Sequence, residues 1–162
     1  MDEILEILQN NAKADSKDMA KQLNLPEQEV KKRIMEYEKK GVIIKYKAII
    51  NKELLTDEIQ DVTALIEVKV TPQKDKGFDS IAERIYRFPE VVSCYLLSGG
   101  YDLLVIVRGP DLKTVSSFVS EKLAPMENIN GTVTHFILKK YKDDGDILIS
   151  QHPKDTRPAV SA

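Results

Sequence analysis

Lysine and arginine residues gather in one short stretch of an otherwise acidic chain. Residues 31–47 hold seven cations and two anions, a net charge of +5. The complete chain of 162 residues has a formal net charge of −2, so the residues outside this stretch carry −7. A local concentration of positive charge attracts phosphate groups, and it favours a nucleic-acid partner more clearly than uniform basicity would. A solvated basic helix face in an unrelated helical element would show the same charges.

Three predicted helices position this basic stretch. Residues 2–12 form the first helix, and Ser16 can cap the second. The second helix has an inward face of Met19, Ala20 and Leu23. Residues 24–26 end the second helix, because Pro26 disfavours helical backbone at the residue before it. The third helix ends at Gly41, and its apolar stripe consists of Val30, Ile34 and Tyr37. This pattern predicts a helix-turn-helix, whose second helix enters the DNA major groove.

The outer face of the last of these helices supplies the candidate DNA contacts. Gln28 and Lys31 are three residues apart on one face, so both can reach base edges. Lys32 is a candidate phosphate contact, which positions a protein on DNA without reading sequence. Arg33 has two interpretations that the residues leave open: it contacts DNA, or it holds the domain together through a carboxylate.

Residues 42–50 are rich in branched and aromatic side chains and predict a strand that serves as a wing or a connection. Lys45 and Lys47 lie on one side of it, because side chains on a strand repeat every second residue. They can contact phosphates, or they can keep an exposed strand edge from aggregating.

The second half of the chain alternates between strand and helix patterns. The predicted strands are 62–70, 91–98, 101–108 and 129–141, and the predicted helices are 78–88 and 111–123. The order βαββαβ predicts a ferredoxin-like antiparallel sheet with both helices on one face. Several strands, such as 103–107, are apolar on both faces. A second sheet, most simply from an identical subunit, is therefore expected to cover the open face.

The segment Ser98-Gly99-Gly100-Tyr101-Asp102 is the candidate site for a small ligand. Paired glycines can expose backbone N–H groups to a carboxylate, and Asp102 can pair with an ammonium group, so a free amino acid fits. Two glycines are also what a tight hairpin requires when φ is positive, and the residues alone favour that explanation. Thr134 on the last strand is a further candidate.

Composition narrows the remaining classes of function. No apolar run approaches the ~20 residues of a membrane span, and the acidic, amphipathic start is unlike a secretory signal. A single cysteine, Cys94, fits a reducing cytoplasm, and with His135 and His152 it cannot make a convincing zinc site. No common catalytic or phosphate-loop motif is present, so we expect no cofactor, no metal and no enzymatic activity.

Periodicity and charge divide the chain into four segments. Residues 1–50 form the predicted winged helix-turn-helix domain, and residues 51–61 form a linker that loses periodicity. Residues 62–141 form the predicted ferredoxin-like domain, and residues 142–162 form a C-terminal extension. Within this extension, residues 147–149 can add a short edge strand. The fold class is therefore α+β.

Two motifs in this order resemble the Lrp/AsnC, or feast/famine, transcription regulators. Residues 30–34 and 38–48 resemble that family's recognition helix and hinge strand. Residues 89–91 and 98–103 resemble its effector-sensing module. The resemblance implies a sequence-specific regulator of double-stranded DNA with an amino-acid effector. It also implies a homodimer, built on the ferredoxin-like domains, that assembles into tetramers or octamers. Tyr37 departs from the pattern, because the family usually has leucine there.

Three alternatives remain at this point. An architectural DNA-binding regulator without an effector fits the same basic helix. A ferredoxin-like dimeric enzyme would need convergent His, Arg and carboxylate groups, of which the sequence offers His135 and little else. An amino-acid sensor that does not bind DNA would not need the basic helix or the lysine-rich strand.

Overall fold

The computed structural model describes residues 2–55, 61–72 and 77–148. The chain divides into two compact units, Met1–Ile50 and Asn51–Ala162. In the described ranges, no helix is both long and apolar enough to cross a membrane.

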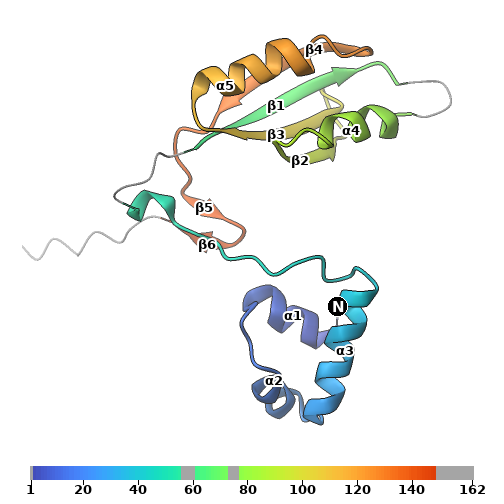
Figure 1. The fold of residues 1–162 in the computed structure, drawn as a ribbon, viewed down its shortest axis with the longest axis vertical. Coiled ribbons are helices and arrows are strands. Elements are labelled where there is room, and N and C mark those ends of the chain that lie inside the picture. The colour runs from blue at the N-terminus through green and yellow to red at the C-terminus, as the bar shows by residue number, and fades with distance from the viewer. Residues whose placement is uncertain (1, 56–60, 73–76, 149–162) are drawn as a thin grey trace, which may run out of the picture. The chain divides into compact units, whose positions relative to one another are not determined.

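Three helices form the N-terminal unit: α1 (Glu3–Asn10), α2 (Ser16–Leu23) and α3 (Glu27–Lys39), as Figure 1 shows. All three predicted helices are therefore present, and the first is shorter than expected. Each helix contributes apolar side chains to one small core: Ile4, Leu8, Met19, Ala20 and Val30. A core of this size holds the helix-turn-helix together because each short helix buries one apolar stripe against the other two.

The ends of α2 and α3 have specific local causes. Asp15, not Ser16, is the N-cap of α2, because its carbonyl accepts the first helical bond, from the Met19 N–H, at 3.0 Å. The predicted Ser16 cap is therefore wrong by one residue. Gly41 ends α3 as predicted: its φ is +70°, a left-handed conformation that glycine adopts without steric cost. The Gly41 N–H donates to Glu38, and the Val42 N–H donates to Tyr37, which together form a Schellman motif.

The strand predicted for residues 42–50 is absent. These residues are neither helix nor strand, and the Ile44 side chain is 88% exposed. A strand needs hydrogen bonds to a neighbouring strand, and nothing in the described part of the chain pairs with this segment. The segment contacts α3 at its start, where the Val42 and Ile43 N–H groups donate to the Tyr37 carbonyl, and through the Tyr46 hydroxyl, which donates to Glu38 Oε1 at 2.9 Å.

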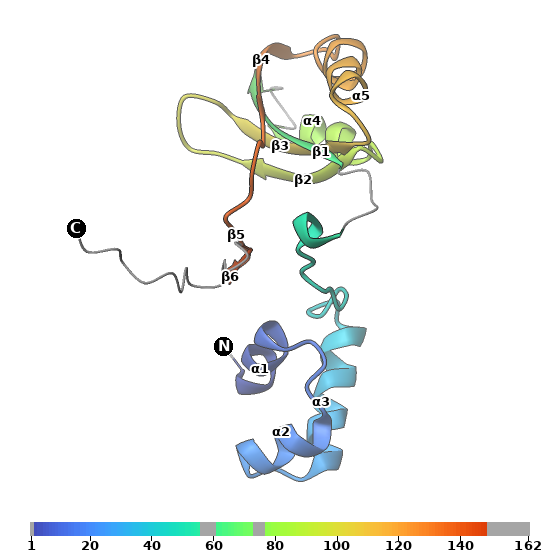
Figure 2. The ribbon, with the colours of Figure 1, turned by 90° about the vertical axis from the view of Figure 1, so that its left-hand side faces the viewer.

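The C-terminal unit contains an antiparallel sheet with strand order β2-β3-β1-β4. Its strands are β1 (Val62–Val70), β2 (Val91–Leu96), β3 (Leu103–Gly109) and β4 (Ile129–Phe136). The helices are α4 (Asp79–Tyr86) and α5 (Leu112–Ser117), and α5 continues as the π-helix η2 (Phe118–Leu123). The predicted βαββαβ order and ferredoxin-like topology are confirmed, and Figure 2 shows both helices on the same face of the sheet. The last strand is shorter than the predicted 129–141.

The helix-covered face of the sheet forms the core of this unit. Ile66 in β1 lies opposite Val105 in β3, and both side chains are fully buried. Phe88 and Phe118 meet edge to face, with ring centroids 5.4 Å apart, which joins the end of α4 to η2. Asp111 caps α5 as predicted, because its carboxylate accepts the Thr114 N–H at 2.6 Å.

The opposite face of the sheet also carries apolar side chains. Leu65 and Ile106 lie opposite each other on this face and are only partly exposed. Tyr95 is 51% exposed and Val133 is 39% exposed. An apolar sheet face of this kind is the feature that the sequence predicted from strands with two apolar sides.

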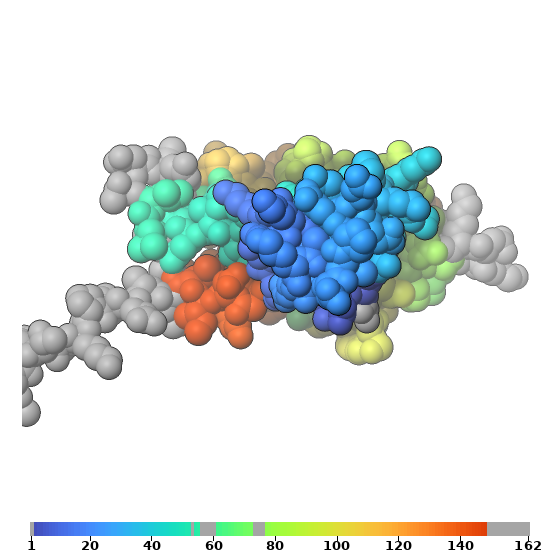
Figure 3. Space-filling model, turned by 90° about the horizontal axis from the view of Figure 1, so that it is seen from below, coloured from blue at the N-terminus to red at the C-terminus, as the bar shows by residue number. Residues whose placement is uncertain are grey.

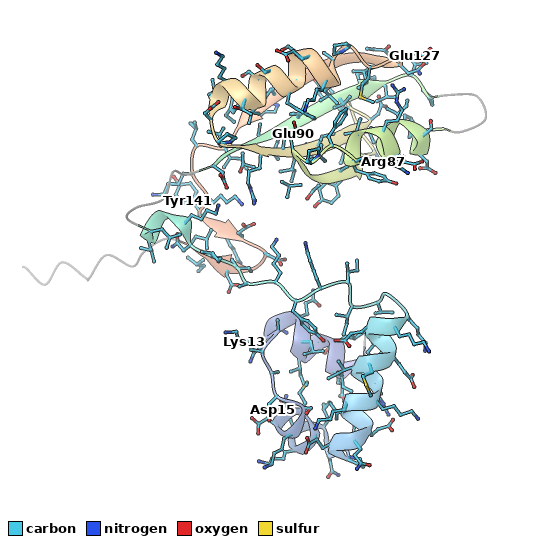
Figure 4. The ribbon with its side chains drawn as sticks, viewed as in Figure 1. Lys13, Asp15, Arg87, Glu90, Glu127 and Tyr141 are labelled. Atoms are coloured by element: carbon cyan, nitrogen blue, oxygen red, sulfur yellow. The ribbon has the colours of Figure 1, made fainter. Side chains whose placement is uncertain are left out.

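The C-terminal extension begins with a short hairpin of β5 (Lys142–Asp143) and β6 (Asp146–Ile147). The edge strand predicted for residues 147–149 is therefore wrong for Ile147, which pairs with Lys142 instead of the main sheet; residue 149 lies outside the described ranges. Left-handed backbone at Asp144 and Gly145 forms the tight turn that folds the segment on itself. Tyr141, labelled in Figure 4, precedes this hairpin, and the one-turn helix η1 (Lys52–Leu54) begins the unit.

Candidate functional site

The outer face of α3 presents the residues that the sequence selected for DNA. Gln28, Lys31 and Lys32 are all exposed, whereas Val30 between them is fully buried. Figure 3 shows the surface of the N-terminal unit in blue, with α2 and α3 facing the viewer. A helix with this division between a buried and a polar face can place its outer side chains in a groove while its inner face remains in the core.

The two lysines on this face differ in their partners. Lys31 pairs with Glu27, one turn earlier on α3, and the hydrogen bond to that carboxylate raises the pKa of Lys31. Lys32 has no acidic partner in the ranges that the structure describes. Glu27 therefore offsets part of the charge of Lys31, and Lys32 is the cation that is free for a phosphate.

Arg33 points to carboxylates of its own unit. Its Nε lies 2.9 Å from Glu29 Oε1, and its Nη1 lies 3.7 Å from Asp2 Oδ2. Asp2 also accepts a hydrogen bond from the Tyr37 hydroxyl at 2.8 Å and from the Ile4 N–H at 2.8 Å. Of the two interpretations left open, the structure shows the contact with carboxylates. Asp2 thus connects the first turn of α1 to the middle of α3.

The contact with Asp2 gives a structural reason for tyrosine at position 37, where the family usually has leucine. Its hydroxyl needs a partner, and Asp2, 35 residues earlier, supplies it. The hydrogen bond lowers the pKa of the Asp2 carboxyl and raises the pKa of the Tyr37 phenol. Because the carboxyl pKa is lowered by folding, this contact stabilises the unit above the ordinary aspartate pKa, and the stabilisation is lost as the pH falls through the lowered value.

We expect Tyr37→Phe to weaken DNA binding by roughly two- to fivefold, the low end for a lost hydrogen bond, because the site is partly exposed. The ring still fills the apolar stripe, but α3 loses its hydrogen bond to Asp2 at the start of α1 and keeps the Arg33 contact and the shared core. Fluorescence anisotropy with duplex DNA measures this affinity. Tyr46→Phe is the matched control, because it removes a phenol that bonds to Glu38 and not to α1. Equal losses in the two variants would contradict a specific role for Tyr37.

Lys45 and Lys47 lie on the exposed segment that follows α3. Both side chains are exposed, and neither has an acidic partner in the described part of the chain. The segment is not part of a sheet in this chain. The alternative that these lysines protect a sheet edge from aggregation therefore does not apply within one chain. They remain free cations near the end of α3.

The second candidate site is the turn between β2 and β3, residues 97–102. The Leu97 N–H donates to the Asp102 carbonyl at 2.8 Å, which closes the turn. Neither Gly99 nor Gly100 has the left-handed φ that the hairpin explanation requires. That explanation for the paired glycines is therefore wrong, because it depends on a positive φ.

Asp102 has structural contacts that sequence reasoning did not foresee. Its carboxylate accepts the Val70 N–H at 2.8 Å, at the point where the pairing of β1 with β4 shifts register. The Lys69 ammonium lies 3.4 Å from the same oxygen. Lys69 was not among the predicted site residues, and no motif marks it; only the register of β1 brings it to the turn.

The remaining predicted ligand residues are not all together. Ser98 is exposed, and Tyr101 is half-buried, in the same turn as the glycines. Thr134 lies opposite Ile66 in the β1–β4 ladder, on the face that the helices cover. The structure therefore places Ser98, Tyr101 and Asp102 in one turn, whereas Thr134 is on a different part of the sheet.

Other polar groups of this unit form pairs of their own. His135 Nε2 lies 3.6 Å from Glu67 Oε1, and no group of metal-ligating side chains occurs among the described residues. Cys94 is partly buried and packs against the core, and this burial raises the pKa of its thiol. Glu90, labelled in Figure 4, pairs with Lys122, which lowers its pKa, and both line a hollow of about 280 Å³ beside α5.

Comparisons with known proteins agree with this arrangement. Residues 3–44 match the model of a winged helix-turn-helix DNA-binding domain, and residues 63–147 match that of the Lrp/AsnC ligand binding domain. The second match alone spans more than half of the chain. The chain belongs to the Lrp/AsnC family. It is a DNA-binding transcriptional regulator of the Lrp/AsnC type. Its second domain is the ligand-binding domain of this family.

Individual relatives of the Lrp/AsnC protein extend over nearly its whole length. The uncharacterised HTH-type transcriptional regulator YugG of Bacillus subtilis is 52% identical, over 90% of this chain and 87% of its own. The leucine-responsive regulatory protein of Haemophilus influenzae is 27% identical, over 90% and 86%. A transcriptional regulator of Neisseria meningitidis, solved in complex with L-methionine, is 26% identical with a TM-score of 0.67, over 86% of this chain and 88% of its own.

Proposed function

We propose that this Lrp/AsnC regulator is a homodimer that binds double-stranded DNA through α3 and changes its affinity when an amino acid binds at the turn of residues 98–102. The observation that carries the proposal is the pairing of two features in one chain. One is a helix with exposed cations on its outer face. The other is a glycine turn that neither backbone strain nor packing explains.

For DNA, Gln28 and Lys31 read base edges, while Lys32, Lys45 and Lys47 contact phosphates. Exposure of all five side chains supports this assignment. Arg33 keeps its contacts with Asp2 and Glu29, so its contribution to DNA binding is to hold α3 in place.

A second subunit covers the open face of the sheet. The apolar side chains on that face support this arrangement, because a contiguous exposed apolar patch usually marks an interface. Two-fold symmetry then gives the dimer two recognition helices for two half-sites. Dimers assemble further into tetramers or octamers, as the family resemblance implies.

The effector is a free amino acid bound at Ser98, Gly99, Gly100, Tyr101 and Asp102. The open space above both glycines and the Asp102 carboxylate support this class of ligand. The Neisseria meningitidis relative was solved with L-methionine, which shows that a protein of similar fold accepts an amino acid. Thr134 is the weakest candidate for this site, because it lies on the helix-covered face of β4.

The regulator acts by binding and not by catalysis, and it works in the cytoplasm beside the DNA. One consideration supports this proposal: the relatives are named as transcriptional regulators.

The test is a fluorescence-anisotropy titration of the purified full chain against duplex DNA from its own promoter. It is repeated at several salt concentrations, with and without a mixture of the twenty standard L-amino acids. We expect tight, salt-dependent binding that prefers the promoter over a scrambled duplex and shifts with the amino acids.

Three other results of this titration would each contradict one part of the proposal. Binding that does not respond to the amino acids would favour an architectural regulator without this effector class. Equal affinity for the scrambled duplex would contradict base reading by Gln28 and Lys31. The absence of DNA binding would overturn the assignment of α3.

A further inference from the structure

Lys69 and Asp102 form a charged pair at the glycine turn, and Lys69 has no role in the function proposed above. Lys69 lies near the end of β1, and its ammonium is 3.2 Å from the Gly100 carbonyl oxygen and 3.4 Å from Asp102 Oδ2. The Lys69 side chain is 49% exposed, whereas the Asp102 side chain is 18% exposed. One positive and one negative group therefore meet at the turn, and the positive group is accessible to solvent.

Asp102 is the fixed member of this pair, and Lys69 is the movable one. The carboxylate is held by the Val70 N–H, which belongs to the sheet. The Lys69 side chain is long and half-exposed, and an ion pair with an exposed partner contributes little net stability. Lys69 can therefore exchange Asp102 for another anion at small cost.

Three glycines leave room around this pair. Gly99 and Gly100 belong to the turn, and Gly131 lies opposite Lys69 in the ladder of β1 and β4. None of the three has a left-handed φ, and a Cβ built at any of them meets no atom within 4 Å. Neither a left-handed φ nor packing within the described residues requires glycine at these positions.

We propose that Lys69 binds the α-carboxylate of an amino-acid effector while Asp102 binds its ammonium group. This inference rests on the proposed effector function and adds the residue that recognises the acid end of the ligand. Without ligand, the two side chains pair with each other. The zwitterion replaces this single ion pair with two, because it carries one charge of each sign.

This arrangement predicts selectivity for α-amino acids. A simple amine can satisfy Asp102, but it leaves the Lys69 ammonium without a partner. A simple carboxylic acid satisfies Lys69 and leaves Asp102 without one. A charge that loses its partner on binding weakens the complex, so the site discriminates against both.

The test is isothermal titration calorimetry of the full chain with each of the twenty standard L-amino acids. The L-amino acid that binds most tightly is then compared with its own α-amide, which lacks the carboxylate charge. Both ligands are titrated into wild type, Lys69→Gln and Lys69→Arg. The matched control is Lys140→Gln, which removes another lysine that pairs with an aspartate, Asp143, away from the turn.

We expect Lys69→Gln to weaken binding of the amino acid by about 10- to 100-fold, the range for a lost charged hydrogen bond. Lys69→Arg should restore most of the affinity, and Lys140→Gln should bind as wild type does. The α-amide should bind weakly to wild type and show no further loss in Lys69→Gln. A purely structural support for the turn would not produce this difference between the two ligands.

Other outcomes overturn separate parts of the proposal. Equal losses for the amino acid and its amide in Lys69→Gln would make Lys69 a support of the turn only. Unchanged amino-acid binding in Lys69→Gln would remove Lys69 from the site and leave the proposed effector function intact. If none of the twenty amino acids binds to wild type, the proposed effector class fails and this inference fails with it.

Discussion

Lys32→Ala is expected to weaken DNA binding on the order of tenfold at low salt and to reduce its salt dependence. Lys32 is exposed on α3 and has no acidic partner in the ranges that the structure describes, so its full charge is available to a phosphate. Each phosphate contact contributes about 0.9 to the slope of log K against log salt concentration. The proposed dimer would lose two contacts, so the slope should fall by about 1.8.

Lys31→Ala provides the comparison on the same helix face. Lys31 already pairs with Glu27, so its replacement exposes a carboxylate to the DNA and should also weaken binding. The salt slope should stay closer to that of wild type, because a lysine paired with Glu27 displaces fewer counterions from DNA. Anisotropy titrations at four or more salt concentrations measure both quantities.

Lys40→Ala is the matched control for these two variants. Lys40 is the C-cap of α3 and pairs with Glu36 at 3.7 Å, at the opposite end of the helix from Gln28. Its replacement should leave affinity and slope near those of wild type. A slope that is the same in Lys32→Ala and wild type would contradict a phosphate contact by Lys32.

The second large effect concerns Asp102, for which two replacements give different results. Asp102→Ala removes the acceptor of the Val70 N–H and should destabilise the C-terminal unit by about 1–3 kcal/mol, the cost of leaving a donor on the buried residue Val70 without a partner. It should also abolish the response to amino acids. Asp102→Asn keeps an oxygen that can accept this N–H, so the unit should remain close to wild-type stability.

The response to amino acids then separates the two roles of Asp102. Asp102→Asn lacks the negative charge that attracts an ammonium group, so the response should be lost although the fold is retained. Urea unfolding measures the stability, and DNA titrations with and without the amino-acid mixture measure the response. If Asp102→Asn responds as wild type does, the carboxylate does not bind the effector and its role is structural.

Local patterns in the sequence were sufficient to predict most of the elements. The stripe of Val30 and Ile34 predicted α3, and alternation through residues 62–70 predicted β1 with its buried face. These patterns are reliable because helix and strand side chains repeat with periods of 3.6 and 2, which any apolar face must follow. Gly41 could likewise be identified as a helix end, because its role depends on neighbouring backbone groups only.

Where the sequence prediction was wrong, the decisive partner lay outside the segment. Residues 42–50 have the composition of a strand, but a strand forms only when it pairs with another strand. No strand among the described residues pairs with this segment. The glycines of residues 99–100 suggested a tight hairpin, yet the turn that connects β2 and β3 is longer and needs no positive φ at either position.

The sequence by itself determined the order of helices and strands, the basic face of α3 and the glycine turn, because each depends on neighbours along the chain. Only the tertiary structure decided which side chains meet. Asp2 reaches Tyr37 and Arg33 because α1 packs across α3, and Asp102 reaches Val70 and Lys69 because of the register of the sheet. Contacts between residues about 30 positions apart leave no periodic signal, since they depend on how whole elements pack.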